Sequence, residues 1–433
     1  MDMYSIIHKK RLGEELSEEE IKFFVNGYTD GSIPDYQASA LAMAIMFTGM
    51  THAETALLTK HMALSGDCID LSVFGNFSCD KHSSGGVGDK TTLIVAPIVA
   101  SLGGVVAKMS GRGLGHTGGT VDKLESIPGY KTSLTPEEFT GIASKTGLCV
   151  IGQSTNLAPC DKKLYALRDV TATVDSIPLI VSSIMSKKLA AGSKNIMLDV
   201  KCGSGAFMKT KDDAQKLAVN MVEIGKRNGR NVKALVTNMD VPLGYAIGNS
   251  LEVIEAVNVL KGNITGDILE VCLALASGLV SSFKGIDKKE AYELCRNAVT
   301  SGKAYNKMKE WIEAQGGDVR YIDDTSLFEK ASLSCAVTSE KDGYISSMDA
   351  EKIGLSCCFA GAGRKTKSDI IDMSAGIILA KKTGDAVKQG DVIGTIYSND
   401  KSKLEDAKTH FISAVTISDT KPNLLPLILG EYC

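Results

Sequence analysis

A glycine-rich stretch early in the chain carries charged and hydroxyl side chains that a packed core does not require. Residues 81–93 read KHSSGGVGDKTTL, with Gly85, Gly86 and Gly88 close together. Glycine loses much conformational entropy on folding and has no side chain to pack. Such a cluster is therefore typical of a backbone that closely approaches a small ligand. Free N–H groups of this loop, and of the helix expected from the apolar run after Thr92, favour an anion. Lys81 would add a charge, and Ser83 and Thr92 would add hydroxyl donors.

A second loop of similar composition follows about thirty residues later. Residues 108–126 read KMSGRGLGHTGGTVDKLES, in which five glycines surround Ser110, Thr117 and Thr120. Either loop alone is compatible with a simple glycine-rich turn, but two in one domain predict an oxyanion site. Neither matches the G-x-x-x-x-G-K-[ST] phosphate loop of nucleotide hydrolases. Neither is a G-x-G-x-x-G motif with an acidic residue at the Rossmann spacing.

A third group of polar residues lies in the helical, partly apolar stretch YALRDVTATVDSIPLIVSSIMSKKLAAG. Ser183 and Lys187 are four residues apart and share one face of a helix. With Arg168 they offer a guanidinium fork and an ammonium that suit the carbonyl oxygens of a planar heterocycle. Tyr165 would offer a ring or a hydroxyl nearby. Taken alone, these residues favour an ordinary charged surface.

The elements that must position these residues change type along the chain. Residues 1–66 read as short helices, with capping boxes that begin at Ser17 and Thr51. From about residue 70, short apolar runs alternate with helical stretches, which predicts an α/β domain with a largely parallel or mixed sheet. Residues 160–192 are helical again and are expected to return to the first helical layer. The last hundred or so residues predict a small all-β or α+β module with turns at Gly384 and Gly390. Its turn pattern is similar to lipoyl and biotinyl carriers, but no modifiable lysine stands at a hairpin tip.

The composition predicts two or three domains and neither nucleic-acid nor membrane partners. The 433 residues exceed one ordinary core, and 44% hydrophobic with 23% charged residues is typical of a globular protein. The net charge of −3 provides no basic surface for nucleic acids or anionic membranes. The chain has no apolar signal core and no run near the roughly 20 apolar residues of a membrane span, so a cytoplasmic protein is expected. Eleven scattered cysteines without a C-x-x-C pair indicate reduced thiols rather than disulfides or a zinc site.

These motifs together resemble pyrimidine-nucleoside and thymidine phosphorylases, the second structural class of nucleoside phosphorylases. The resemblance covers essentially the whole chain. It is carried by DKHSSGGVGD, KMSGRGLGHTGGTVDKLESIPG, LYALRDVTATVDSIPLI, SIMSKKLAAG and DVKCGSGAFM, in that order. The stretch PLGYAIGNSLEVIEA and the C-terminal module resemble the broad-specificity branch more closely than strict thymidine phosphorylase.

The resemblance implies an architecture of three parts. An all-helical domain of residues 1–70 with 160–192 would lie on the pyrimidine side and form the dimer face. A larger α/β domain with a mixed sheet, residues 71–159 with 193–330, would bind phosphate. Residues 331–433 would form a C-terminal α+β module of lipoyl-like character. The family works as a homodimer, and a hinge must close to bring phosphate and nucleoside together.

The resemblance also implies roles for individual residues. The catalytic set would be His82, Arg168 and Lys187. Phosphate would be bound by Lys81, His82, Ser83, Thr92, Lys108, Met109, Ser110 and Thr120. The pyrimidine would be held by Tyr165, Arg168, Ser183 and Lys187. A potassium ion would be held, mostly through backbone oxygens, by Gly88, Lys90, Leu243, Ala246 and Glu255, and no organic cofactor is implied.

Lys90 departs from the family pattern, in which a small hydroxyl residue is expected. If the ligand at this position is the backbone carbonyl, the change is compatible with a bound cation. If the ammonium points inward, it displaces the cation.

The reaction implied is phosphorolysis of uridine, thymidine or deoxyuridine by inorganic phosphate, which gives the free base and ribose- or deoxyribose-1-phosphate. It would proceed by direct displacement with inversion. A strict thymidine phosphorylase is one alternative, and the sequence does not choose among the nucleosides. A related phosphoribosyltransferase is another, but it would need magnesium and an acidic cluster beside a glycine loop, where Asp89 and Asp122 form no clear pair. A non-enzymatic binding protein would be expected to lack Lys81, Arg168 or Lys187, and all three are present.

Overall fold

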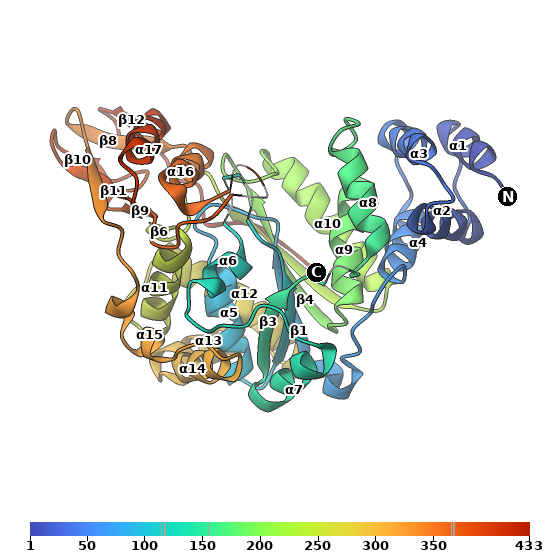
Figure 1. Cartoon of the computed structure of the whole chain (residues 1–433), viewed down its shortest axis with the longest axis horizontal. Helices are drawn as coiled ribbons and strands as arrows, with labels where there is room; N and C mark the ends of the chain where they lie inside the picture. Colours follow the sequence, from blue (N-terminus) through green and yellow to red (C-terminus); the bar gives the residue numbers. More distant parts are fainter. Residues whose placement is uncertain (114, 117, 155, 365, 367–368) are drawn as a thin grey trace.

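The computed structural model of the whole chain describes residues 1–113, 115–116, 118–154, 156–364, 366 and 369–433. Thr117 of the second glycine loop lies outside these residues. The molecule is elongated, with N-terminal helices at one end, a central sheet with its covering helices, and the C-terminal module at the other end (Figure 1). Within the described part of the chain, no single helix is both long and apolar enough to cross a membrane. The consecutive helices Asp267–Lys284 and Lys288–Thr300, which are bent by 117° relative to each other, would be long and apolar enough only when taken together.

The N-terminal helices form a small bundle that includes a later part of the chain. The elements are α1 (Met3–Arg11), α2 (Glu18–Asp30), α3 (Asp35–Thr48), α4 (His52–Ala63), α8 (Pro159–Arg168) and α9 (Ile177–Ala190). The predicted capping boxes at Ser17 and Thr51 are confirmed, each with its reciprocal glutamate three residues later. Buried side chains of α1 to α4 share one apolar cluster with Cys160, Leu164 and Leu179. The 160–192 segment therefore packs on the first helical layer.

A six-stranded sheet in the order β13-β5-β4-β1-β2-β3 forms the centre of the molecule. Its strands are β1 (Ser78–Ser83), β2 (Val105–Ser110), β3 (Leu148–Gly152), β4 (Asn195–Cys202), β5 (Asn231–Asn238) and β13 (Ile428–Tyr432). Strands β1 to β5 are parallel to one another and β13 is antiparallel to β5, so the predicted mixed sheet is confirmed. From its place in the chain, β13 is expected to belong to the C-terminal module of residues 331–433. It lies in the central sheet instead, because it pairs with β5, which would otherwise be an exposed edge strand.

The start of the first glycine loop is a strand rather than a loop. Lys81, His82 and Ser83 end β1, and they pair in register with residues 197–199 of β4. β1 lies between β2 and β4, so backbone hydrogen bonding imposes an extended conformation on a polar sequence that carries no strand signal. Side chains alternate between the two faces of a strand. Lys81 and His82 therefore point to opposite faces of the sheet.

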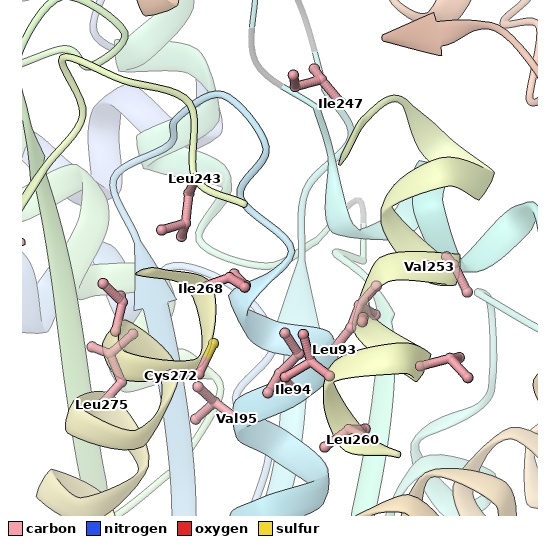
Figure 2. Packing of buried hydrophobic residues seen from close by; sticks show 14 of the residues in the cluster. Leu93, Ile94, Val95, Leu243, Ile247, Val253, Leu260, Ile268, Cys272 and Leu275 are labelled. Carbon is pink, nitrogen blue, oxygen red and sulfur yellow. The ribbon is translucent and has the colours of Figure 1, made fainter. Parts of the chain in front are cut away.

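Helices cover both faces of the sheet (Figure 1). α5 (Thr91–Ser101) and α12 (Asp267–Lys284) pack on one face, with α11 (Asn249–Leu260) against α5, and α9, α10 (Lys211–Arg227) and α7 (Pro136–Thr146) pack on the other. Figure 2 shows the core beside α5, where apolar side chains of α5, α11 and α12 meet. The rest of this part comprises η1 (Ser72–Phe77), α6 (Thr120–Glu125), α13 (Lys288–Thr300), α14 (Lys303–Ala314), α15 (Arg320–Asp323) and η2 (Thr325–Leu327).

The C-terminal module contains two small sheets, in the orders β10-β8-β12 and β6-β9-β11-β7. Its elements are β7 (Leu333–Thr338), β8 (Gly343–Met348), α16 (Ala350–Cys357), η3 (Cys358–Ala362), β9 (Gly376–Leu379), β10 (Ala386–Val387), β11 (Val392–Ser398), α17 (Lys401–Ala414) and β12 (Val415–Ser418). The predicted turns at Gly384 and Gly390 are present. β6 (Ala246–Ile247) comes from the central part and pairs with β9, so this short segment joins the two parts.

Candidate active site

The residues expected to bind phosphate gather at the carboxyl edge of the central sheet. β1 and β2 are neighbouring parallel strands that end at Ser83 and Ser110, and Lys108 and Met109 come just before the second end. α5 begins at Thr91, so Thr92 lies in its first turn, and Thr120 opens α6. Open α/β sheets bind ligands at this edge, where loops and helix N-termini meet.

Lys81 is fixed beneath the first glycine loop by buried acidic groups. Its side chain is 2% exposed, and its Nζ donates to Thr91 Oγ1 and lies 3.4 Å from Asp199 Oδ2 and 3.7 Å from Asp89 Oδ1. Lys201 Nζ lies 2.8 Å from the same Asp199 oxygen. Burial by itself raises the pKa of Asp89, but the ammonium of Lys81 and two further lysines hold this pKa well below its ordinary value. Asp89 is therefore ionised, and the two acids hold the ammonium close to the start of α5.

A second charged cluster lies on the opposite face of β1. Asp80 is fully buried and accepts from Lys108 Nζ at 3.2 Å and from Lys188 Nζ at 2.7 Å. Lys108 also donates to the backbone oxygen of Lys81 at 2.6 Å. Two ammonium groups share one carboxylate, which leaves an excess of positive charge at the sheet edge. Sequence reasoning missed Asp80 and Lys188. Both residues could have been noticed from the sequence, because Asp80 directly precedes Lys81 in the first motif and Lys188 directly follows Lys187.

His82 lies partly buried among these lysines. Burial is the main cause that holds the pKa of His82 well below its ordinary value, and nearby positive charges act in the same direction, those of Lys188, Lys108, Lys81 and Lys187. The imidazole is therefore neutral near pH 7. A neutral ring can hydrogen-bond to a ligand without repelling the lysines around it.

Two of the residues expected to hold the pyrimidine lie side by side on α9. Lys187 Nζ donates to Ser183 Oγ at 3.0 Å, as their spacing of four residues predicts. Lys187 also donates to Asp161 Oδ2 on α8 at 2.5 Å, a partner that sequence reasoning missed. Tyr165, on α8 as well, is 48% exposed.

Arg168 ends α8 and is buried against the chain that connects α8 to α9. Its Nε donates to Thr173 O at 3.1 Å, Nη1 to Leu179 O at 3.1 Å and Nη2 to Val174 O at 2.7 Å. A guanidinium has five N–H donors, and these bonds use three. The fork therefore orders the connection, and two donors are left for a ligand.

A cavity of about 800 Å³ opens beside the end of β2. Met109 and Ser110 line it, and Asp67 and Leu157 contribute from the connections to the helical part. None of the four residues expected to hold the pyrimidine is among its lining residues. Of the residues expected to bind phosphate, only Met109 and Ser110 line it, so this cavity does not contain the whole of either set.

The residues expected to hold potassium are brought together, and the ammonium of Lys90 lies among them. Nζ of Lys90 donates to Leu243 O, Ala246 O and Glu255 Oε2. The oxygens that would coordinate a metal ion are therefore already bonded to a side chain of the protein. With Lys90 in this position, the set does not fit a potassium ion.

Lys108 is expected to make phosphate binding sensitive to pH. Burial, partly opposed by Asp80 and reinforced by Lys188 and Lys81, lowers the pKa of Lys108 to about 8. The ammonium is present below this pH and is lost above it. We therefore expect KM for phosphate to rise as the pH increases through about 8, where phosphate itself is already a dianion. Steady-state kinetics of the phosphorolysis that the resemblance implies, at saturating nucleoside, measure this KM directly.

Matched variants test the assignment to Lys108. Lys108→Gln is expected to have a high KM for phosphate already below pH 8, and its KM should show no further rise as the pH increases through this range. Lys216→Gln changes a lysine whose side chain is 67% exposed and should keep the native profile. A native KM for phosphate that stays constant across this range would contradict the role of Lys108.

Comparisons with known proteins agree with the order of these parts. The model described as "Glycosyl transferase family, helical bundle domain" matches residues 4–66. "Glycosyl transferase family, a/b domain" matches residues 76–305, and "Pyrimidine nucleoside phosphorylase C-terminal domain" matches residues 344–418.

Several curated proteins are similar to the chain over its whole length. Pyrimidine-nucleoside phosphorylase of Geobacillus stearothermophilus is 52% identical over 432 residues and that of Bacillus subtilis 51% over 433, with 100% of both chains covered in each case. Among solved structures, anthranilate phosphoribosyltransferase from Thermus thermophilus matches with a TM-score of 0.58 and 19% identity. That match covers 73% of this chain and 99% of the other, and it shows a shared fold.

Proposed function

The chain belongs to the pyrimidine-nucleoside phosphorylase family, and we propose that it is a pentosyltransferase that cleaves pyrimidine nucleosides with inorganic phosphate. The products are the free base and ribose- or deoxyribose-1-phosphate. One observation carries the proposal. β1 directs Lys81 toward the glycine loop and α5, while its neighbour Asp80 is bonded to Lys188 on α9, the helix that also bears Ser183 and Lys187. A single strand thus supports both a site for an anion and a wall for a base.

Phosphate binds at the carboxyl edge of the sheet. The hydroxyls of Ser83, Thr92, Ser110 and Thr120 and the backbone N–H groups near His82 and Met109 surround it. The ammonium groups of Lys81 and Lys108 supply the charge. These groups are fixed before the substrate arrives, so they position the nucleophile without reorganisation and shield it from water.

The base is activated from the opposite side. As the bond between the base nitrogen and C1′ loosens, negative charge develops on the base and positive charge on the sugar. Lys187 and Arg168 stabilise the base anion, Ser183 hydrogen-bonds to its edge, and Tyr165 contacts its ring or the sugar. The neutral His82 hydrogen-bonds to the base as this charge develops. Phosphate then attacks C1′ from the opposite face, which inverts its configuration without a covalent enzyme intermediate.

This mechanism requires the phosphate-binding edge of the sheet and the helices α8 and α9, which carry the pyrimidine-binding residues, to approach each other. We propose that a hinge closes the helical part onto the sheet edge, and that the enzyme works as a cytoplasmic homodimer whose helical parts pair. Exposed aromatic side chains on the N-terminal helices support the pairing. They are Tyr4 (75% exposed), Tyr36 (74%) and Phe47 (83%).

A phosphoribosyltransferase shares the fold, but the two acidic residues that would hold its magnesium ion are paired with basic side chains in this structure. Asp122 is paired with Arg112 and Arg364, and Asp89 with Lys81. Among the described residues, no group of three or more His, Cys, Asp or Glu side chains is arranged to hold a metal ion.

The decisive experiment measures base release from uridine, thymidine and deoxyuridine, with and without phosphate. We expect release from all three only when phosphate is present, with the sugar phosphate in the inverted configuration by NMR. Release from thymidine alone would assign the strict branch. Release without phosphate would indicate a hydrolase and contradict the proposal. No release, but turnover with phosphoribosyl pyrophosphate and magnesium, would favour the transferase.

A further inference from the structure

The oxygens expected to coordinate potassium surround a cation that belongs to the chain. Lys90 Nζ donates to Leu243 O at 2.9 Å, to Ala246 O at 2.9 Å and to Glu255 Oε2 at 2.5 Å. The Lys90 side chain is completely buried, and that of Glu255 is 4% exposed. An ammonium has three N–H donors. These three acceptors use all of them, so the group is fully satisfied inside the protein.

The carboxylate of Glu255 is also held by backbone groups of the segment that surrounds the ammonium. Glu255 accepts, besides Lys90, the backbone N–H of Tyr245 at 2.7 Å and that of Ala246 at 2.9 Å. Burial by itself lowers the pKa of Lys90, but the negative charge of Glu255 and of acids beyond it raises this pKa above its ordinary value. The ammonium therefore stays charged at every pH at which the protein is expected to work.

The backbone lies close around the ammonium. A Cβ added at Gly244 would lie 2.8 Å from Lys90 Nζ and 2.7 Å from Glu255 Oε2. A Cβ added at Gly88 would lie 2.4 Å from Leu243 O. The chain segments thus approach at glycines, close around the ammonium. A potassium ion bound to the same oxygens would be in contact with a like charge, which is strongly unfavourable in a buried site.

Lys90 connects the first glycine loop to two other parts of the chain. It immediately precedes α5, and its ammonium reaches the segment 243–246 and Glu255 of α11. The side chain of Leu243 is anchored in the core near Ile268 of α12 (Figure 2). β6 at the end of the segment pairs with β9 of the C-terminal module. The contact therefore fixes the backbone of the glycine loop relative to the core and to the module.

We propose that Lys90 is a built-in substitute for a monovalent metal ion, so that neither the fold nor the activity of this protein depends on potassium. Lys90 is a positioning residue, because it acts through the backbone of the glycine loop and the start of α5. The statement about activity rests on the proposed function, whereas the statement about folding does not.

The first test compares the native protein in potassium, sodium and tetramethylammonium chloride at equal ionic strength. We expect the same melting temperature in all three salts and the same KM for phosphate. A rise in melting temperature that is specific to potassium would overturn the proposal. Because melting requires no substrate, this result stands even if the protein proves not to be a phosphorylase.

Two variants at this position separate charge from volume. Lys90→Ser removes the ammonium and leaves space and a hydroxyl. In tetramethylammonium chloride we expect a lower melting temperature and a KM for phosphate about 10- to 100-fold higher, the range seen when a partner that orients a site is removed. Potassium should restore most of both. Lys90→Met fills the space without charge, and potassium should restore little.

Lys10→Ser is the matched control, because Lys10 forms another buried pair with a glutamate, Glu54, at 2.6 Å in the helical bundle. It should destabilise the protein equally in every salt. If Lys90→Ser behaves like Lys10→Ser and shows no response to potassium, Lys90 is an ordinary buried ion pair and the proposal is wrong. If Lys90→Ser does not fold in tetramethylammonium chloride, folding on addition of potassium supports the proposal, and failure to fold in potassium overturns it.

Discussion

Lys81→Met is expected to lower kcat/KM for phosphate on the order of 100- to 1,000-fold, the range for loss of a pre-organised donor that meets developing or bound charge. The native ammonium is held beside the first turn of α5 by Asp89 and Asp199. Without it, these two buried acids retain Lys201 as their main positive partner. The sheet edge would then lose one positive charge and attract a dianion less strongly.

The loss should fall mainly on phosphate. We expect the affinity for the nucleoside, measured by titration without phosphate, to change little, because Lys81 points to the face of the sheet away from α9. Lys216→Met removes a largely exposed lysine and should behave as the native protein. Equal losses for both substrates, together with a large fall in melting temperature, would make Lys81 a structural residue and contradict the assignment.

Arg168→Ala is expected to lower kcat/KM for the nucleoside by about 100-fold or more, again in line with removing one pre-organised charged donor. Two effects contribute to this loss. The variant removes the positive charge proposed to stabilise the base anion. It also releases the carbonyls of Thr173, Val174 and Leu179, so the connection that leads into α9 loses its order. Near-native activity of this variant would refute the assignment.

Arg230→Ala separates the two effects of Arg168. Arg230 is a partly buried arginine that also donates to backbone carbonyls, those of Leu189 in the last turn of α9 at 3.5 Å and of Gly192 just after this helix at 3.2 Å. Its removal should lower the melting temperature but leave the affinity for free uracil nearly unchanged. For Arg168→Ala we expect weaker uracil binding by calorimetry as well. If both variants lose stability and neither loses uracil affinity, Arg168 only orders the backbone.

Local patterns in the sequence determined much of the molecule. The capping boxes at Ser17 and Thr51, the helix that begins after the first glycine loop, and the shared face of Ser183 and Lys187 all appear as predicted. These features depend on residues within about one helical turn of one another. Alternation of apolar runs with helices likewise predicted the mixed sheet, because that pattern repeats along the chain.

Features that depend on distant residues became visible only in the tertiary structure. Asp80 joins Lys108, 28 residues away, to Lys188, 108 residues away, and no local rule connects them. The end of the first glycine motif is a strand because its neighbours in the sheet pair with it. β13 returns to the central sheet because β5 offers an unpaired edge. The sequence left two directions open for the Lys90 side chain, and the choice depended on acceptors 153 to 165 residues further along. A buried charge takes the direction in which its partners lie, and only the complete fold places those partners.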